Sequence, residues 1–128
     1  MSLSSPLRRV LGAGPSRSGV RDWWRQRLTS IALVPLSIWF VASLLALPSF
    51  DHVMVVAWMA QSWTALLLIL LVLIGAWHSQ LGLKVIIEDY VHDEGGKTLL
   101  LVLIGFAHVL IAAAGTFAVL KVAFGGAP

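Results

Sequence analysis

A histidine and an Asp-Tyr pair on one apolar stretch are the residues of this chain most suited to chemistry. His78 lies inside a stretch apolar enough to span a membrane, and Asp89 and Tyr90 stand where that stretch meets water. An imidazole at membrane depth costs free energy and therefore marks a candidate functional site. Eleven residues make just over three helical turns, so His78 and Asp89 lie about 20° apart around a helix and about 16 Å apart along it. A buried metal or cofactor ligand and a polar pocket at the lipid headgroups would therefore share one face of the helix.

The composition indicates a membrane protein. Of the 128 residues, 59% are hydrophobic and only 12% are charged. A soluble domain of this length has too little interior to bury so much apolar surface. The chain has no cysteine, which excludes disulfides, thiolate metal sites, bound iron–sulfur clusters and covalently attached c-type haem. Histidine is therefore the best remaining metal ligand.

The basic residues are concentrated before the first apolar stretch. Six of the nine Lys and Arg residues lie within residues 8–27. This pattern is a membrane-topology signal rather than a nucleic-acid-binding surface. It predicts an N-terminus in the cytoplasm or matrix and, after three spans, a C-terminus on the periplasmic or intermembrane side. A short arginine-rich tail directly before the first span favours a bacterial inner membrane, with the mitochondrial inner membrane as the alternative.

The fold predicted is an all-α membrane protein with three transmembrane helices. Each apolar stretch reaches the roughly 20 residues that a helix needs to cross the hydrocarbon core. The second stretch begins between Val53 and Ser62. Residues 1–20 are rich in Ser, Gly, Pro and Arg, which predicts a mobile tail. The organisation is a basic segment over 1–27, spans over about 28–47, 58–87 and 98–122, and a short tail over 123–128.

Two motifs, together with the three spans, resemble a known family. One is the run His78-x3-Gly82-x6-Asp89-Tyr90. The other is the segment GVRDWWRQRLTSI over residues 19–31, which leads into the first span. Both are similar to the smaller hydrophobic membrane-anchor subunits of succinate dehydrogenase, the succinate:quinone oxidoreductase. The resemblance covers roughly residues 19–122.

The resemblance implies a role inside a larger redox complex. The three helices would form part of a two-subunit, haem-binding bundle with a cytochrome b membrane subunit, and the pair would hold one haem b and a ubiquinone site. A flavoprotein and an iron–sulfur protein would dock on the cytoplasmic or matrix face. The chain itself would hold no flavin and no iron–sulfur cluster, so it could not oxidise succinate alone. Its surroundings would be membrane lipid and these partners, without nucleic acid.

The resemblance also implies roles for particular residues. His78 would be one axial ligand of the haem iron, with the second histidine supplied by the partner. Tyr90 would donate a hydrogen bond to a quinone carbonyl, with Asp89 beside it. Arg27 would lie near the haem propionates, and so would Arg21, although the family often has histidine at that position.

The residues themselves leave alternatives open. Gly75 and Gly82, at i−3 and i+4 from His78, would leave room for a flat macrocycle, but small residues also serve helix packing. His108 lies mid-span in the third stretch with small residues around it, so it competes as a ligand or is a hydrogen-bonded histidine. The other functions to be considered are a fumarate reductase anchor running in reverse and a haem-free anchor or assembly protein. A small transporter is disfavoured because the chain has no inverted repeat and no series of intramembrane acids.

Overall fold

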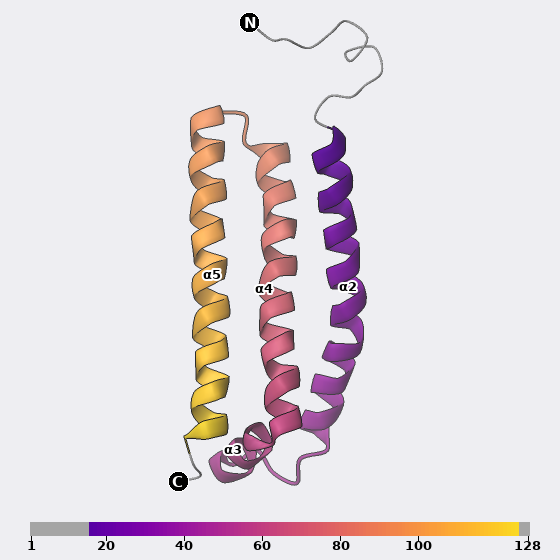
Figure 1. Cartoon of the computed structure of the whole chain (residues 1–128), viewed down its shortest axis with the longest axis vertical. Helices are drawn as coiled ribbons and strands as arrows, with labels where there is room; N and C mark the ends of the chain where they lie inside the picture. Colours follow the sequence, from indigo (N-terminus) through magenta and orange to yellow (C-terminus); the bar gives the residue numbers. More distant parts are fainter. Residues whose placement is uncertain (1–15, 126–128) are drawn as a thin grey trace, which may run out of the picture.

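A computed structural model describes residues 16–125 of the chain (Figure 1). The described part is entirely helical. Three long helices and one short helix follow one another as α2 (Ser16–Leu45), α3 (His52–Ala60), α4 (Ser62–Tyr90) and α5 (Glu94–Phe124).

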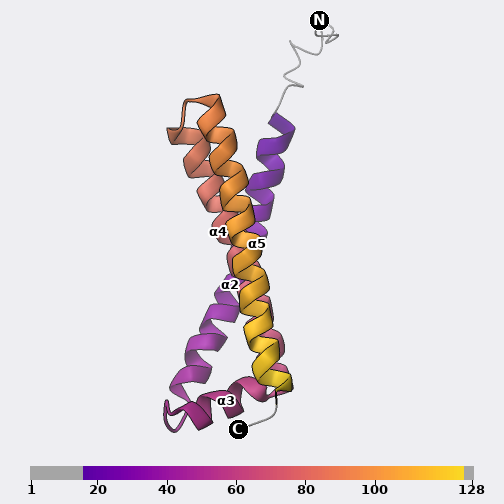
Figure 2. The same cartoon turned by 90° about the vertical axis from the view of Figure 1, so that its left-hand side faces the viewer.

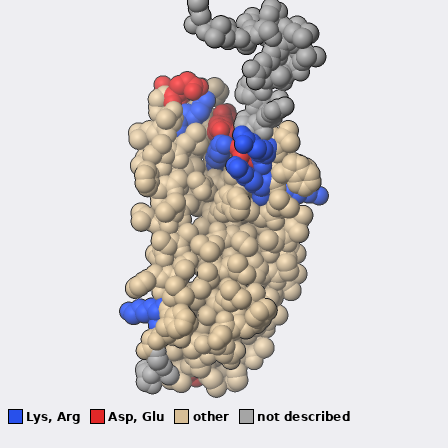
Figure 3. Space-filling view, in the orientation of Figure 1, with Lys and Arg blue, Asp and Glu red and all other residues tan. Residues whose placement is uncertain are grey.

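The long helices form an up-down-up bundle with α4 in the middle. α4 packs against both α2 and α5, and α2 crosses it at an angle (Figures 1 and 2). The short helix α3 lies across one end of the bundle and contacts α4 and α5. At the opposite end, the start of α2 lies near the α4–α5 connection. This end carries most of the described charged side chains, from residues 21–27 and 84–97, and we call it the charged end (Figure 3).

The long helices are membrane-spanning by length and composition. They comprise Gly19–Leu45, Ser62–Tyr90 and Glu94–Phe124, and only 6% to 11% of the residues in their most apolar windows are buried. A helix satisfies its backbone polar groups internally, as a lipid environment requires. The exposed apolar side chains of these helices would then face lipid instead of water. The predicted all-α fold with three spans is confirmed. Its wide apolar exterior is available to lipid and to other membrane subunits.

The boundaries differ from the predicted ones at the starts of the first and second spans. α2 already begins at Ser16, so residues 16–20, predicted as part of a mobile tail, are helical. Residues 1–15 and 126–128, which contain the rest of both predicted tails, lie outside the described residues. The second span is a separate helix from Ser62 onward, and residues 52–60 form α3 instead. Gln61 divides the two with an extended backbone (φ −65°, ψ 127°), and its N–H still bonds the Trp58 carbonyl.

α3 is held in place by a cap and by aromatic packing. The Asp51 carboxylate accepts a hydrogen bond from the Met54 N–H and caps the helix. Hydrogen bonds from the Ser49 hydroxyl and the Met54 backbone lower the pKa of this carboxyl. The Trp58 ring stacks on Trp39 of α2, with ring centroids 6.3 Å apart. A single ring thus fixes the direction of α3 relative to the first span.

Packing of α4 against α5 depends on a missing side chain at Gly115. A Cβ built there would approach Val72 Cγ1 to 2.7 Å, whereas one at Gly105 would meet only Gln80 Nε2 at 3.6 Å. A β-branched valine has little freedom to move aside. The two helices therefore touch closely at this point, as small residues permit in membrane proteins.

We expect Gly115→Ala to destabilise the α4–α5 pair by about 1–3 kcal/mol, the usual cost of overpacking. The matched variant Gly105→Ala should be neutral or slightly stabilising, because its new methyl has room. Unfolding of the full chain in detergent, followed by circular dichroism, measures both. Val72→Ala should restore stability in the Gly115→Ala background, and a failure to do so would show that the clash is not the cause.

Candidate functional site

His78 of α4 points at α2 and contacts two of its polar side chains. Its Nδ1 lies 2.9 Å from Thr29 Oγ1, and its Nε2 lies 3.5 Å from Gln26 Nε2. Thr29 is only 4% exposed, and its hydroxyl also lies 2.8 Å from the Arg25 carbonyl oxygen and 3.0 Å from that of Gln26. The imidazole therefore has one close partner, at Nδ1, and one long contact, at Nε2.

Gln26 and Thr29 were not identified as partners of His78 from the sequence. They stand three residues apart on α2, so they share a face of that helix. α2 and α4 run in opposite directions (Figure 1), and this face of α2 contacts His78 of α4. The spacing of the two polar residues within the segment over residues 19–31 was the available signal, but only the register of the two helices shows that they meet His78.

His108 of α5 is a satisfied histidine. Its Nδ1 lies 2.7 Å from the Ile104 carbonyl oxygen and its Nε2 lies 3.2 Å from Ser79 Oγ. The side chain is buried, with 8% exposure. Both ring nitrogens thus have hydrogen-bond partners on α4 or α5, which agrees with the hydrogen-bonded alternative for His108. The Nε2 atom of His78, by contrast, has Gln26 Nε2 at 3.5 Å as its hydrogen-bond partner in the structure.

The surroundings of His78 are partly open. A Cβ built at Gly75, one turn earlier on α4, would meet nothing within 4 Å, whereas one at Gly82 would lie 3.6 Å from Gln26 Nε2. The Gln26 Oε1 atom is buried without a hydrogen-bond partner. A buried polar atom of this kind is unusual, and Thr116 Oγ1 is the other one in the described residues. Space for a flat group is therefore open beside Gly75, whereas a group bound at Nε2 would have to displace the Gln26 side chain.

Two grooves between α2 and α4 adjoin this contact. One has a volume of about 270 Å³ and includes Gln26, and the other has about 190 Å³ and includes Thr29. The first is lined by Gly19, Asp22, Trp23, Gln26, Leu81, Lys84, Val85 and Glu88. Small-molecule sites usually enclose about 300–1,000 Å³. Each groove is smaller than that, so a large ligand at His78 would need further walls from a partner.

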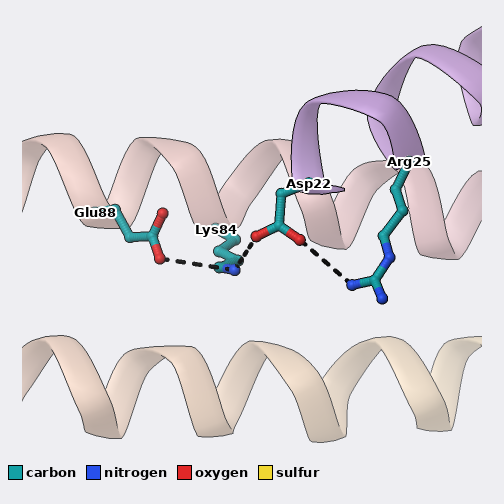
Figure 4. A network of polar contacts seen from close by, with 4 residues as sticks. All are labelled: Asp22, Arg25, Lys84 and Glu88. Atoms are coloured by element: carbon teal, nitrogen blue, oxygen red, sulfur yellow. Dashed lines mark hydrogen bonds and ion pairs between the residues drawn. The ribbon is translucent and has the colours of Figure 1, made fainter. Parts of the chain in front are cut away.

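An ion-pair network fixes α2 against α4 above His78 (Figure 4). The Lys84 ammonium donates to the Asp22 carboxylate across the two helices and lies 3.8 Å from Glu88 on its own helix. Arg25 Nη1 lies 3.4 Å from the second Asp22 oxygen. Lys84 and Glu88 stand at i, i+4 spacing on α4, and Asp22 is the nearer partner of Lys84. With 23% and 35% side-chain exposure, the Asp22–Lys84 pair contributes at most about 1 kcal/mol.

The remaining predicted site residues lie at the charged end, apart from His78. Tyr90 is the last residue of α4 and is 79% exposed, and Asp89 beside it is also exposed. Arg21 and Arg27 are exposed on α2, and the Arg27 guanidinium lies 5.9 Å from the centre of the Trp23 ring. His78 and Asp89 share one continuous helix, as predicted. The structure gives no contact that joins Tyr90 or the arginines to His78.

A metal site made of clustered ligands is absent from the part of the chain that the structure describes. Among residues 16–125, no three His, Cys, Asp or Glu side chains come together as a metal-binding group. A single histidine suffices for a haem whose other axial ligand comes from elsewhere. The chemistry available here is therefore one imidazole ligand and, about three helical turns away, a phenol and a carboxylate at the membrane surface.

Comparison with known proteins identifies relatives of this chain. A family model for the transmembrane subunit of succinate dehydrogenase and fumarate reductase matches residues 1–114. The succinate dehydrogenase hydrophobic membrane anchor subunit of Rickettsia conorii is 30% identical over 103 residues, covering 79% of this chain and 82% of the relative. The corresponding subunit of Rickettsia felis is 34% identical over 97 residues, covering 75% and 81%. The succinate dehydrogenase membrane anchor subunit of Reclinomonas americana is 32% identical over 92 residues, covering 70% and 77%. The chain therefore belongs to the family of succinate dehydrogenase and fumarate reductase transmembrane subunits.

Proposed function

We propose that this chain is the hydrophobic membrane-anchor subunit of a succinate dehydrogenase, working in electron transfer from succinate to ubiquinone. Its family, its three membrane-spanning helices and the names of its relatives support this role. The chain supplies no dicarboxylate site of its own. It holds the flavoprotein and the iron–sulfur protein at the membrane through the charged end, where polar side chains stand clear of the apolar bundle (Figure 3).

His78 is the proposed axial ligand of a haem b shared with a second membrane subunit, the cytochrome b subunit. The single observation that carries this assignment is the Nε2 atom, whose neighbour at 3.5 Å is a weak contact, in contrast to the two satisfied nitrogens of His108. The open space at Gly75 and the unpartnered Gln26 Oε1 fit a bulky group at this place. The haem supplies a one-electron carrier within the membrane. His78 would hold it by coordination, and Arg27 and Arg21 at the start of the first span would offer guanidinium groups to its propionates.

Tyr90 and Asp89 are the proposed contribution of this chain to the ubiquinone-reduction site. The phenol donates a hydrogen bond to one quinone carbonyl and stabilises the negative charge that develops there. Asp89 relays a proton from the aqueous side. Since Tyr90 is 79% exposed in the isolated chain, the other walls of the pocket come from partner subunits.

The proposed orientation places the charged end in the cytoplasm or matrix. The arginines before and within the first turns of α2 favour that side. The three spans then put the end of α5 on the periplasmic or intermembrane side, in a bacterial inner membrane or a mitochondrial inner membrane. The charged end is thereby on the side where soluble catalytic subunits are synthesised or matured.

Deletion of this chain tests the anchor role directly. We expect succinate oxidation with a soluble dye to move from the membrane fraction to the soluble fraction, because the catalytic subunits lose their attachment. Ubiquinone reduction should be lost. The measurement is the distribution of both activities after ultracentrifugation, with re-expression of the chain as the control. Dye-linked activity that stays on membranes without this chain would contradict the anchor role.

A further inference from the structure

We propose that Thr29 is a positioning residue that fixes the tautomer and orientation of the His78 imidazole. In this arrangement Nδ1 carries the proton and donates it to Thr29, which leaves the Nε2 lone pair free to bind a metal. The inference rests on the proposed haem-ligand function of His78. It concerns residues of this chain alone, on two helices that the Asp22–Lys84 pair holds in register.

The single proton of the Thr29 hydroxyl determines which group is the donor in the hydrogen bond between Thr29 and His78. Thr29 Oγ1 lies 2.8 Å from the Arg25 carbonyl oxygen and 3.0 Å from the Gln26 carbonyl oxygen, and both of these groups can only accept. The hydroxyl proton therefore points back along α2, as threonines in membrane helices commonly arrange it. His78 Nδ1, 2.9 Å away, must then be the donor. A neutral imidazole with its proton on Nδ1 has its lone pair on Nε2.

Gln26 contacts the His78 nitrogen that would bind a metal. Its Nε2 lies 3.5 Å from His78 Nε2, which is long for a hydrogen bond, and its Oε1 is buried without a partner. An amide so poorly satisfied loses little when it is displaced. The carboxamide thus covers the lone pair in the isolated chain and would give way to a stronger ligand. Thr29, in contrast, is held by three short contacts and 4% exposure, so it remains in place.

A hydrogen bond from the second ring nitrogen changes the ligand as well as its position. Donation from Nδ1 makes the imidazole more basic and orients its ring, and outer partners of this kind typically change metal affinity by about 10- to 100-fold. A more basic ligand favours the oxidised metal. Loss of the Thr29 hydroxyl should therefore weaken haem binding and raise the reduction potential of the haem that remains.

The experiment compares three threonine variants in the intact complex. Thr29→Val keeps the shape and removes the acceptor, Thr29→Ser keeps the acceptor, and Thr64→Val is the matched control. Thr64 is also 4% exposed, but its hydroxyl lies 3.5 Å from Gln61, at the other end of α4. We expect a haem potential more positive than wild type and roughly tenfold weaker haem retention for Thr29→Val alone. An unchanged potential in Thr29→Val, or an equal shift in Thr64→Val, would overturn the inference.

A second measurement reads the tautomer without haem. In the full chain carrying ¹⁵N-histidine and no haem, His78 should show a protonated Nδ1 and an unprotonated Nε2, with His78→Ala assigning the signals. A protonated Nε2 would overturn the inference. Failure of the underlying function is distinguishable: full haem retention in His78→Ala would overturn the ligand assignment and this inference together. If haem is lost in His78→Ala but haem retention and potential are unchanged in Thr29→Val, this inference alone is overturned.

Discussion

Replacement of His78 by alanine should remove haem from the complex while leaving its subunits assembled. The imidazole is the only group of α4 proposed to bind iron, so its loss leaves the haem with the partner's ligand alone. We expect haem per complex to fall at least about tenfold, since even outer-shell changes cost that much. The effect on insertion should be small, because alanine is compatible with an apolar helix and His78 is only half-buried in this chain.

The measurement is haem content per flavoprotein in the purified complex. His108→Asn is the matched control, since it alters the other intramembrane histidine, whose two nitrogens already bond Ile104 and Ser79. It should retain haem at the wild-type level. Haem lost from the His108 variant and kept in His78→Ala would reverse the assignment of the ligand. Disassembly of the complex in His78→Ala would indicate that the residue acts in packing.

Replacement of Tyr90 by phenylalanine should separate the two half-reactions. The phenyl ring keeps its bulk at the end of α4, but the donor to the quinone carbonyl is gone. Removal of one donor to a developing negative charge costs about 10²–10³ in well-organised sites, and we expect at least a tenfold fall in ubiquinone reduction. Succinate oxidation by a soluble dye should be unchanged, because the proposed function leaves that chemistry to the flavoprotein.

The ratio of ubiquinone-linked to dye-linked activity is the quantity to measure. Tyr90 is the only tyrosine of the chain, so the control uses a neighbouring side chain of the charged end. Glu88→Gln alters an exposed carboxylate paired with Lys84 and should leave the ratio at the wild-type value. An equal loss of both activities in Tyr90→Phe would mean that the residue holds the subunits together and takes no part at the quinone.

The topology could be predicted from the sequence because each span is long and continuously apolar. The sequence placed the start of α4 only within the range from Val53 to Ser62, because neither proline nor glycine marks the break at Gln61. That break depends on tertiary contacts: Trp58 must turn toward Trp39 of another helix. The early start of α2 also involves a contact between helices, because Asp22 near its start pairs with Lys84 of α4.

The site was predictable to the level of single residues but not of their partners. An ionisable residue in an apolar run is visible in any sequence, so both His78 and His108 were candidates. The choice between them depends on which nitrogens find partners, and Ser79 satisfies His108 from the helix that also carries His78. Likewise, Thr29 reaches His78 only in the antiparallel register of α2 and α4. Local patterns along one helix carry no information about such pairings.

An optical difference spectrum of the complex purified through this chain, succinate-reduced minus oxidised, tests the central claim most directly. We predict a b-type haem band in the wild type, together with the flavoprotein and iron–sulfur subunits on the same gel, and the loss of that band in His78→Ala. Co-purifying subunits with no haem band in the wild type, or a band that His78→Ala leaves intact, would contradict the claim that this chain holds the haem through His78.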